Sequence, residues 1–257
     1  MSCNETEDDD SDLEQAMGFM FDSSHARSCL SFSPVGCLAP IRLRMIKGDP
    51  GHVQSGQYLW PAAQFAAGWL FEHRSDPWLA AEQLHVVELG AGCGLAGLAL
   101  AQLPNVASVC LTDYDYGSLA LLQENADEAK TLDCVGDGEK NLLVARVKWG
   151  APLPPLISSI CAENSNVLVV GTDLIYSQDV IQPLLQTAQQ LLRSEGGGGD
   201  ASLRRFVLFS SFDISDYDSE VARACHELKL DLREVSSLDL DSLPPQARVQ
   251  TFSLMSL

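Results

Sequence analysis

A run of glycines directly after a short apolar segment constrains this chain more than any other feature. Residues 86–94 read Val-Val-Glu-Leu-Gly-Ala-Gly-Cys-Gly, and an apolar helical pattern follows over residues 95–100. Glycines at every second position let the backbone turn tightly from a strand into a helix, and they let a ligand lie against bare peptide. The run therefore predicts a strand, a tight turn and a helix that together bind a ligand.

The carboxylate of Glu88, two residues before the first glycine, narrows the class of ligand. A phosphate site at a helix N-terminus favours positive charge nearby, so a fixed carboxylate suits a cationic or hydroxyl-rich ligand better. S-adenosylmethionine, with its ammonium, sulfonium and ribose groups, is such a ligand. The glycines at 92, 94 and 97 also match the GxGxxG pattern of dinucleotide-binding proteins. Asp113, which ends the next predicted strand, can bind ribose hydroxyls in either class of cofactor, so both classes stay open at this point.

Composition and charge disfavour several classes of function. The 257 residues carry a formal net charge of −19, with only 16 lysines and arginines, which disfavours a direct nucleic-acid surface. No run approaches the ~18–20 apolar residues of a membrane span, and the acidic N-terminus is unlike a secretory signal. Eight scattered cysteines without a CxxC pair predict reduced thiols and no metal site. We expect a cytoplasmic protein, with the nucleus as the other candidate compartment.

The N-terminal part of the chain indicates an acidic tail in front of one domain. Seven Asp and Glu residues within the first fourteen positions predict a disordered tail over residues 1–28. The domain is expected to span residues 29–257. Strands at 37–45 and 53–59 are expected to form an N-terminal β-hairpin, and Pro61 is expected to open a helix.

From residue 84 onward, strands and helices alternate, which predicts an α/β fold with a Rossmann-like, mostly parallel sheet of seven strands and helices on both faces. The last two strands follow each other with no helix between them, so the final strand is expected to be antiparallel. A proline-rich linker is expected before the fourth strand, and a glycine-rich loop over residues 196–199. Strands are expected at 84–89, 106–112, 141–148, 166–172, 204–211, 230–236 and 248–255, and helices at 61–71, 95–103, 116–130, 183–193 and 217–228.

Two tryptophans and an Asp-x-x-Tyr motif supply the remaining candidate site residues. Trp149 ends a predicted strand beside a glycine, where its indole can stack on an adenine ring. Asp173 and Tyr176 follow another strand, at the edge where open α/β sheets bind ligands, and are close enough to line one small pocket. Trp60 precedes a predicted helix and could close the pocket with an apolar face. Ordinary packing or capping roles stay open for all four residues.

Four motifs in this order resemble one family of proteins. They are Gly56-Gln57-Tyr58-Leu59-Trp60-Pro61-Ala62-Ala63, the run from Glu88 to Gly94, Lys148-Trp149-Gly150 and Thr172-Asp173-Leu174-Ile175-Tyr176. Together they resemble the eukaryotic family 16 of seven-β-strand methyltransferases, which includes many protein-lysine methyltransferases, over roughly residues 40–255. Lys148 departs from the acidic or neutral residue that is usual in this family before the Trp-Gly pair, which leaves the local electrostatics open.

The resemblance implies a cofactor and roles for the site residues. It implies S-adenosylmethionine as the cofactor. Asp173 and Tyr176 would be the catalytic residues, which orient the acceptor amine. The implied cofactor contacts, together with those argued above, are Trp60, Glu88, Gly90, Ala91, Gly92, Gly94, Asp113, Trp149 and Thr172.

The resemblance also implies a protein substrate. Lysine is the implied acceptor, while arginine, histidine and a small molecule stay open as acceptors. We expect a monomer whose partner is a protein with an exposed lysine, and not a nucleic acid or a membrane. An NAD(P)-dependent oxidoreductase and a catalytically silent protein-binding module of the same fold are the alternatives.

Overall fold

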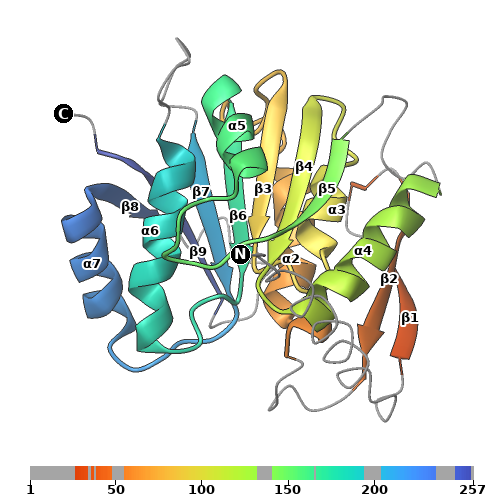
Figure 1. The fold of residues 1–257 in the computed structure, drawn as a ribbon, viewed down its shortest axis with the longest axis horizontal. Helices are drawn as coiled ribbons and strands as arrows, with labels where there is room; N and C mark the ends of the chain where they lie inside the picture. The colour runs from red at the N-terminus through yellow and green to blue at the C-terminus, as the bar shows by residue number, and fades with distance from the viewer. Residues whose placement is uncertain are drawn as a thin grey trace, which may run out of the picture.

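A central seven-stranded sheet organises the molecule (Figure 1). The computed structural model describes residues 27–33, 36–37, 39–47, 55–131, 141–164, 166–193, 204–235 and 247–255. The strands of this sheet are β3 (Leu84–Leu89), β4 (Val106–Asp113), β5 (Asn141–Arg146), β6 (Val167–Thr172), β7 (Arg205–Ser210), β8 (Leu230–Glu234) and β9 (Arg248–Leu254). They lie in the order β5-β4-β3-β6-β7-β9-β8.

The direction of the strands confirms the predicted mixed sheet. Strands β5, β4, β3, β6 and β7 pair in parallel, whereas β9 pairs antiparallel with both β7 and β8. The final strand therefore lies between its two neighbours and runs against them. When β3 is counted as strand 1, this order becomes 3-2-1-4-5-7-6. It differs from the 3-2-1-4-5-6 order of dinucleotide-binding folds because the last strand lies between the fifth and the sixth. The chain reverses its direction of travel across the sheet between β3 and β6, which is where open α/β sheets bind ligands.

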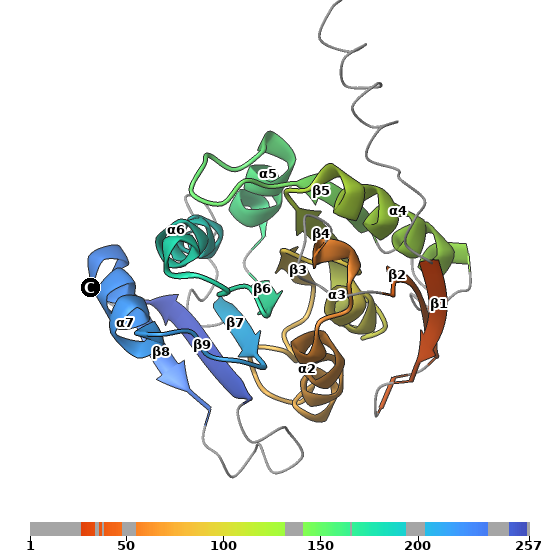
Figure 2. The same ribbon diagram turned by 90° about the horizontal axis from the view of Figure 1, so that it is seen from below.

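Helices cover both faces of the sheet (Figure 2). One face packs against α2 (Pro61–Glu72), α3 (Leu95–Leu100) and α4 (Tyr116–Thr131), and the other packs against α5 (Pro155–Glu163), α6 (Ile181–Leu192) and α7 (Tyr217–Leu228). Each face has its own hydrophobic core. All six residues of β6 are buried, because this strand is covered on both sides by helices.

The predicted N-terminal hairpin exists, but its strands differ from the expected ones. Strand β1 (Arg27–Phe32) pairs antiparallel with β2 (Ile41–Ile46). The predicted second strand at 53–59 is wrong, because residues 55–57 form a 3-10 turn, η1 (Ser55–Gln57), in which Gln57 is buried. Strand β1 begins at Arg27, inside the predicted tail; residues 1–26 of that tail lie outside the described residues.

Asn125 of α4 joins the hairpin to the glycine run. Its side chain is fully buried. The Oδ1 atom accepts the Arg44 N–H at 2.8 Å, and Nδ2 donates to the carbonyl oxygens of Arg44 and Cys93, each at 3.0 Å. Ion pairs of Arg42 with Glu128 and of Arg27 with Glu124 add surface contacts between the hairpin and α4. The hairpin is thus connected to the turn that follows β3.

The segment before β6 forms helix α5, where the sequence predicted a linker. Its prolines do not prevent a helix, because Pro154 is the N-cap and Pro155 is the first helical residue, where the missing N–H costs nothing. The helix ends against the side chain of Arg204, which is 2% exposed.

Arg204 caps the carboxyl ends of two helices. Its guanidinium donates to the carbonyl oxygens of Cys161 and Asn164 at the end of α5. It also donates to those of Leu191 and Arg193 at the end of α6, each at 3.3 Å. These carbonyl groups have no partner within their own helices, so one buried cation stabilises both helix ends.

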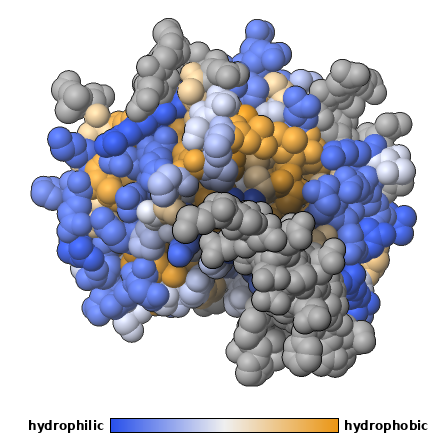
Figure 3. Space-filling model, in the orientation of Figure 1, coloured by the Kyte–Doolittle hydropathy of each residue, from blue (hydrophilic) through white to orange (hydrophobic). Residues whose placement is uncertain are grey.

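The remaining predicted strands and helices are confirmed, most to within two residues at each end, with α3 ending three residues early. The glycine-rich loop at 196–199 lies outside the described residues. In Figure 3 apolar surface gathers in the upper part of this face, and Leu156 of α5 is 50% exposed. Within the described ranges no helix is long and apolar enough to cross a membrane, and the six cysteines described there are free thiols.

Candidate active site

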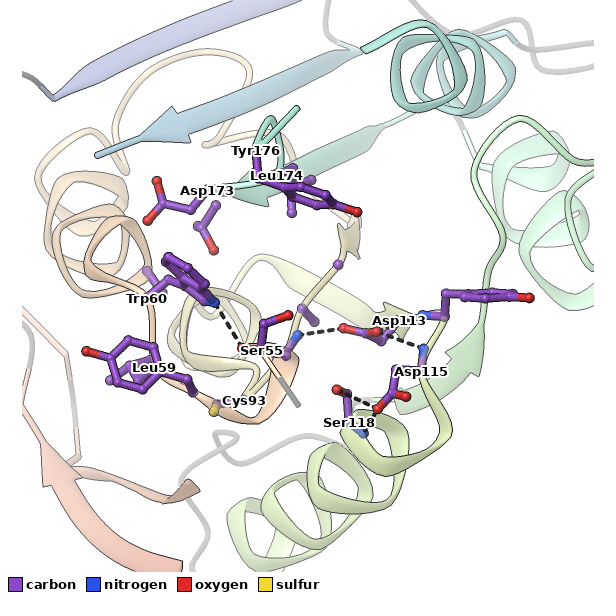
Figure 4. Close-up of a pocket in the computed structure, with 18 of the residues that line it drawn as sticks. Ser55, Leu59, Trp60, Cys93, Asp113, Asp115, Ser118, Asp173, Leu174 and Tyr176 are labelled. Carbon is purple, nitrogen blue, oxygen red and sulfur yellow. Dashed lines mark hydrogen bonds between the residues drawn. The ribbon is translucent and has the colours of Figure 1, made fainter. Parts of the chain in front are cut away.

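A cavity of about 580 Å³ opens at the carboxyl ends of the parallel strands. Its lining comes from the turns after β3, β4, β5 and β6 and from the segment that precedes α2. Of the eleven residues predicted from the sequence, nine line it: Trp60, Gly90, Ala91, Gly92, Asp113, Trp149, Thr172, Asp173 and Tyr176. Figure 4 shows Asp173, Trp60 and Tyr176 at one end of the cavity and Asp113, Asp115 and Ser118 at the other.

The glycine turns leave no room for side chains. Gly90 and Gly92 both have φ = 54°, in the left-handed region that favours glycine. A Cβ atom on Gly90 would lie 2.7 Å from Leu174 Cδ2 and 3.1 Å from Trp149 Cζ2. On Gly92 it would lie 2.7 Å from the carbonyl oxygen of Gly56, which belongs to η1. The backbone is therefore bare toward the cavity, as the sequence predicts.

Glu88 and Gly94 are the two predicted contacts that do not line the cavity, and their role toward the cofactor stays a prediction. Glu88 is 1% exposed and lies behind the turn, where its Oε2 accepts the N–H of Gly97 in α3 at 2.8 Å. Its Oε1 has no hydrogen-bond partner in the structure. Gly94 is buried and is the N-cap of α3. The Glu88 carboxylate thus holds α3 against β3. The sequence pattern alone does not show whether this side chain faces the cavity or the helix.

Burial raises the pKa of Glu88 from its ordinary 4.5 to about 8; the Gly97 hydrogen bond opposes this shift and the nearby Asp113 charge adds to it. Between these pH values the folded protein holds a proton that the unfolded chain has released, so stability falls as the pH rises through this range. We expect wild type to lose roughly 2–4 kcal/mol of unfolding free energy from pH 5 to pH 9 through this group. Glu88→Gln, which cannot ionise, should show a flatter profile in urea unfolding at pH 5, 7 and 9.

Glu82→Gln is the matched control, because Glu82 is exposed and lies two residues before Leu84, the first residue of β3, and this variant should keep the wild-type profile. Parallel pH profiles for Glu88→Gln and wild type would contradict the assignment.

Asp113 connects the turn after β3 to the turn after β4. Its Oδ2 accepts the Gly92 N–H at 3.1 Å, and its Oδ1 accepts the N–H groups of Tyr114 at 2.7 Å and Asp115 at 3.1 Å. Burial raises the pKa of Asp113, and these backbone hydrogen bonds oppose the shift. The carboxylate is therefore fixed in direction at the end of β4.

Two tryptophans form apolar walls. Trp149 is half-buried against the core that α5, α6 and α7 cover, and its ring edge lies beside Gly90. Trp60 is the N-cap residue of α2, and its Nε1–H donates to the Ser55 carbonyl oxygen at 3.0 Å. Its ring contacts Phe212 at a centroid distance of 6.0 Å. Both indoles therefore take fixed positions at the cavity.

Asp173 and Tyr176 differ sharply in exposure. Asp173 is 7% exposed, and its carboxylate accepts hydrogen bonds from Ala62 and Ser211. Tyr176 is 62% exposed. Partial burial and the charges of Asp179 and Asp113 raise the pKa of the Tyr176 phenol, so it remains a hydrogen-bond donor at neutral pH.

Several lining residues were not predicted. Asp115 caps α4, since its Oδ2 accepts the N–H of Ser118 at 2.7 Å and its hydroxyl at 3.0 Å. The Asp-x-x-Ser spacing before a helical pattern could have indicated this cap. Tyr114 and Lys148 also line the cavity, and Lys148 Nζ lies 5.9 Å from the Tyr114 ring centroid. In the part of the chain that the structure describes, no three His, Cys, Asp or Glu side chains are arranged to hold a metal ion.

This chain is similar to known methyltransferases in sequence. A family model described as lysine methyltransferase matches residues 42–200. A Debaryomyces hansenii protein, named protein N-terminal and lysine N-methyltransferase EFM7, is 28% identical over 234 residues, which cover 84% of this chain and 84% of the relative. Danio rerio protein N-lysine methyltransferase METTL21A is 31% identical over 106 residues, which cover 41% of this chain and 43% of the relative.

A solved structure of a candidate RNA methyltransferase from Pyrococcus horikoshii has a similar fold. Its TM-score is 0.50 at 16% identity, over 80% of this chain and 90% of that one. The family model matches more than half of the chain, which excludes the alternative of an NAD(P)-dependent oxidoreductase. The chain belongs to the lysine methyltransferase family, whose members take the methyl group from S-adenosylmethionine.

Proposed function

We propose that this protein transfers a methyl group from S-adenosylmethionine to the side-chain amine of a lysine in a protein substrate. The observation that carries the proposal is a single cavity that joins the bare glycine turns to Asp173 and the exposed Tyr176. The relatives support a protein amine as the acceptor, because the D. hansenii protein is named for protein N-termini and lysines and the D. rerio protein for lysines.

The residues of the cavity fit this cofactor. A volume of about 580 Å³ is typical of sites for ligands of this size. The bare backbone at Gly90 and Gly92 gives close approach, Asp113 offers a carboxylate to hydroxyl groups, and Trp149 offers an aromatic face to adenine. When bound, S-adenosylmethionine supplies a methyl group on a positively charged sulfur. Glu88 would act indirectly, since it fixes the turn from behind.

At the other end of the cavity, Asp173 and Tyr176 would align the acceptor amine. Only the neutral amine has a free lone pair, and burial beside the apolar Trp60 and Leu174 disfavours the ammonium form. Asp173 already accepts three hydrogen bonds from the protein, so we assign it to alignment and not to proton removal. Alignment of two reactants can contribute about 7–11 kcal/mol to lowering a barrier.

The proposed cofactor site is tested by binding of S-adenosylhomocysteine. Trp149→Ala should weaken binding by about 1–3 kcal/mol, the usual contribution of stacking between a base and an aromatic ring. Trp78→Ala is the matched control, because Trp78 packs on Trp69 and does not line the cavity. Calorimetry of both variants beside wild type gives the comparison. Equal affinities for Trp149→Ala and Trp78→Ala would contradict the proposed adenine contact.

The reaction is tested by transfer of tritium from labelled S-adenosylmethionine into proteins of a whole-cell lysate, followed by mass spectrometry of the labelled band. We expect methylated lysine. A modified N-terminal amine would move the acceptor class to protein N-termini. Cofactor binding without any transfer would favour the silent binding module.

A further inference from the structure

The carboxylate of Asp173 is held by donors from two distant parts of the chain. Its Oδ1 accepts the Ser211 N–H at 2.7 Å. Its Oδ2 accepts the Ser211 hydroxyl at 2.8 Å and the Ala62 N–H at 3.0 Å. Asp173 and Ser211 are both buried, at 7% and 8% exposure. These hydrogen bonds join the ends of β6 and β7 to the first turn of α2.

The backbone at Asp173 turns the side chain toward these donors. Its N–H donates to the Phe209 carbonyl oxygen at 2.8 Å, which extends the pairing of β6 with β7 by one residue. Its φ is 54°, which is uncommon for any residue but glycine and is found mostly where surrounding contacts enforce it. In Figure 4 the carboxylate lies on the side of the cavity where Trp60 begins α2. The two Ser211 hydrogen bonds supply such contacts.

Helix α2 has no N-cap side chain of its own. Trp60 occupies the N-cap position without a side-chain hydrogen bond, and Pro61 has no N–H to donate. The Ala62 N–H is therefore the first amide that needs an acceptor, and Asp173 supplies it. The carboxylate thus connects the Trp60 wall to the end of the cavity where the acceptor is proposed to bind.

The number of acceptor positions limits what Asp173 can do. An ionised carboxylate offers about four lone-pair positions, and protein donors take three of them. One position, on Oδ1, is left for a further donor. Its direction is set by the Ser211 N–H on the same oxygen and by the two donors on Oδ2.

We infer that Ser211 is a positioning residue for methyl transfer, which acts by directing the free Oδ1 position of Asp173 toward the acceptor amine. This inference rests on the proposed function. Ser211 does not line the cavity, so it would act through Asp173 alone. A purely structural role would change the melting temperature but would not reduce the rate at saturating cofactor selectively.

Ser211→Ala is the direct test, because it removes the hydroxyl and keeps the N–H. The initial rate of tritium transfer into lysate proteins at saturating S-adenosylmethionine should fall roughly tenfold, as expected when one hydrogen bond to a charged group is lost. The dissociation constant of S-adenosylhomocysteine should stay within about twofold, since the hydrogen bonds of Asp113 are untouched. Ser211→Thr keeps a hydroxyl and should restore most of the rate.

Ser210→Ala is the matched control. Ser210 is also buried and is the neighbouring residue, but it makes no hydrogen bond to Asp173, so its variant should transfer at the wild-type rate. Should Ser211→Ala fail to fold, Ser211→Cys keeps the volume with only a weak S–H donor, and the same loss of rate is expected. An unchanged rate in the alanine or cysteine variant overturns the inference, as does a loss of rate matched by an equal loss of cofactor affinity or not restored by threonine. Failure of wild type to transfer methyl groups would overturn the proposed function itself.

Discussion

Gly92→Ala should weaken binding of S-adenosylhomocysteine by about 2–3 kcal/mol, or roughly 30- to 150-fold. The added Cβ would lie 2.7 Å from the Gly56 carbonyl oxygen, which is backbone and cannot rotate away. The φ of 54° adds the strain of an L-residue in the left-handed region. The Gly92 N–H, which donates to Asp113, would move with the turn. Titration calorimetry of the purified variant measures the loss.

Gly68→Ala is the matched control for this prediction. Gly68 lies within α2, and a Cβ there would meet no atom within 4 Å. The same substitution should therefore leave affinity unchanged and raise stability by up to ~1 kcal/mol through helix propensity. An affinity of Gly92→Ala within threefold of wild type would show that the glycine turn does not bind the cofactor.

Arg204→Met should cost about 3–5 kcal/mol of unfolding free energy and lower the melting temperature by about 10 °C or more. The substitution keeps a buried apolar stem but removes the guanidinium. Four carbonyl groups at the ends of α5 and α6 would then lose their buried donor. Urea unfolding and thermal melting measure the effect.

Arg193→Met serves as the control, because the Arg193 side chain is exposed and only its carbonyl oxygen meets Arg204. Its stability should stay within about 0.5 kcal/mol of wild type. Arg204 comes directly before β7 and so lies at the amino ends of the parallel strands, whereas the cavity lies at their carboxyl ends. Folded Arg204→Met should therefore bind S-adenosylhomocysteine as wild type does. A stability loss no larger than that of Arg193→Met would refute the capping role.

Most elements of the fold follow from the sequence because their apolar patterns are unambiguous. The buried run of β6 and the strand-turn-helix at 84–100 are examples, and both were confirmed. Helix α5 was missed because consecutive prolines are typical of linkers as well as of helix starts. Strand β1 was missed because four of its six residues are exposed, which leaves little apolar alternation to detect.

The site was only partly predictable for a different reason. Apart from the segment around the start of α2, the residues that line the cavity follow strand ends or glycines, which the sequence pattern reveals. The partners of Asp173 do not, since Ser211 and Ala62 are 38 and 111 residues away in sequence. The inward direction of Glu88 also depends on α3 lying against β3, and a single sequence cannot show that packing.

The contact of Asn125 with both Arg44 and Cys93 bears on where a working fragment of this protein can begin. The family model starts at residue 42, within β2, and so divides the hairpin between its two strands. A fragment that begins there would lack β1, the pairing partner of β2. Asn125 would then connect the Cys93 carbonyl oxygen to an unpaired β2 strand. The working boundary for expression is therefore set by pairing across the hairpin and lies at or before Arg27, fifteen residues ahead of the family's own border.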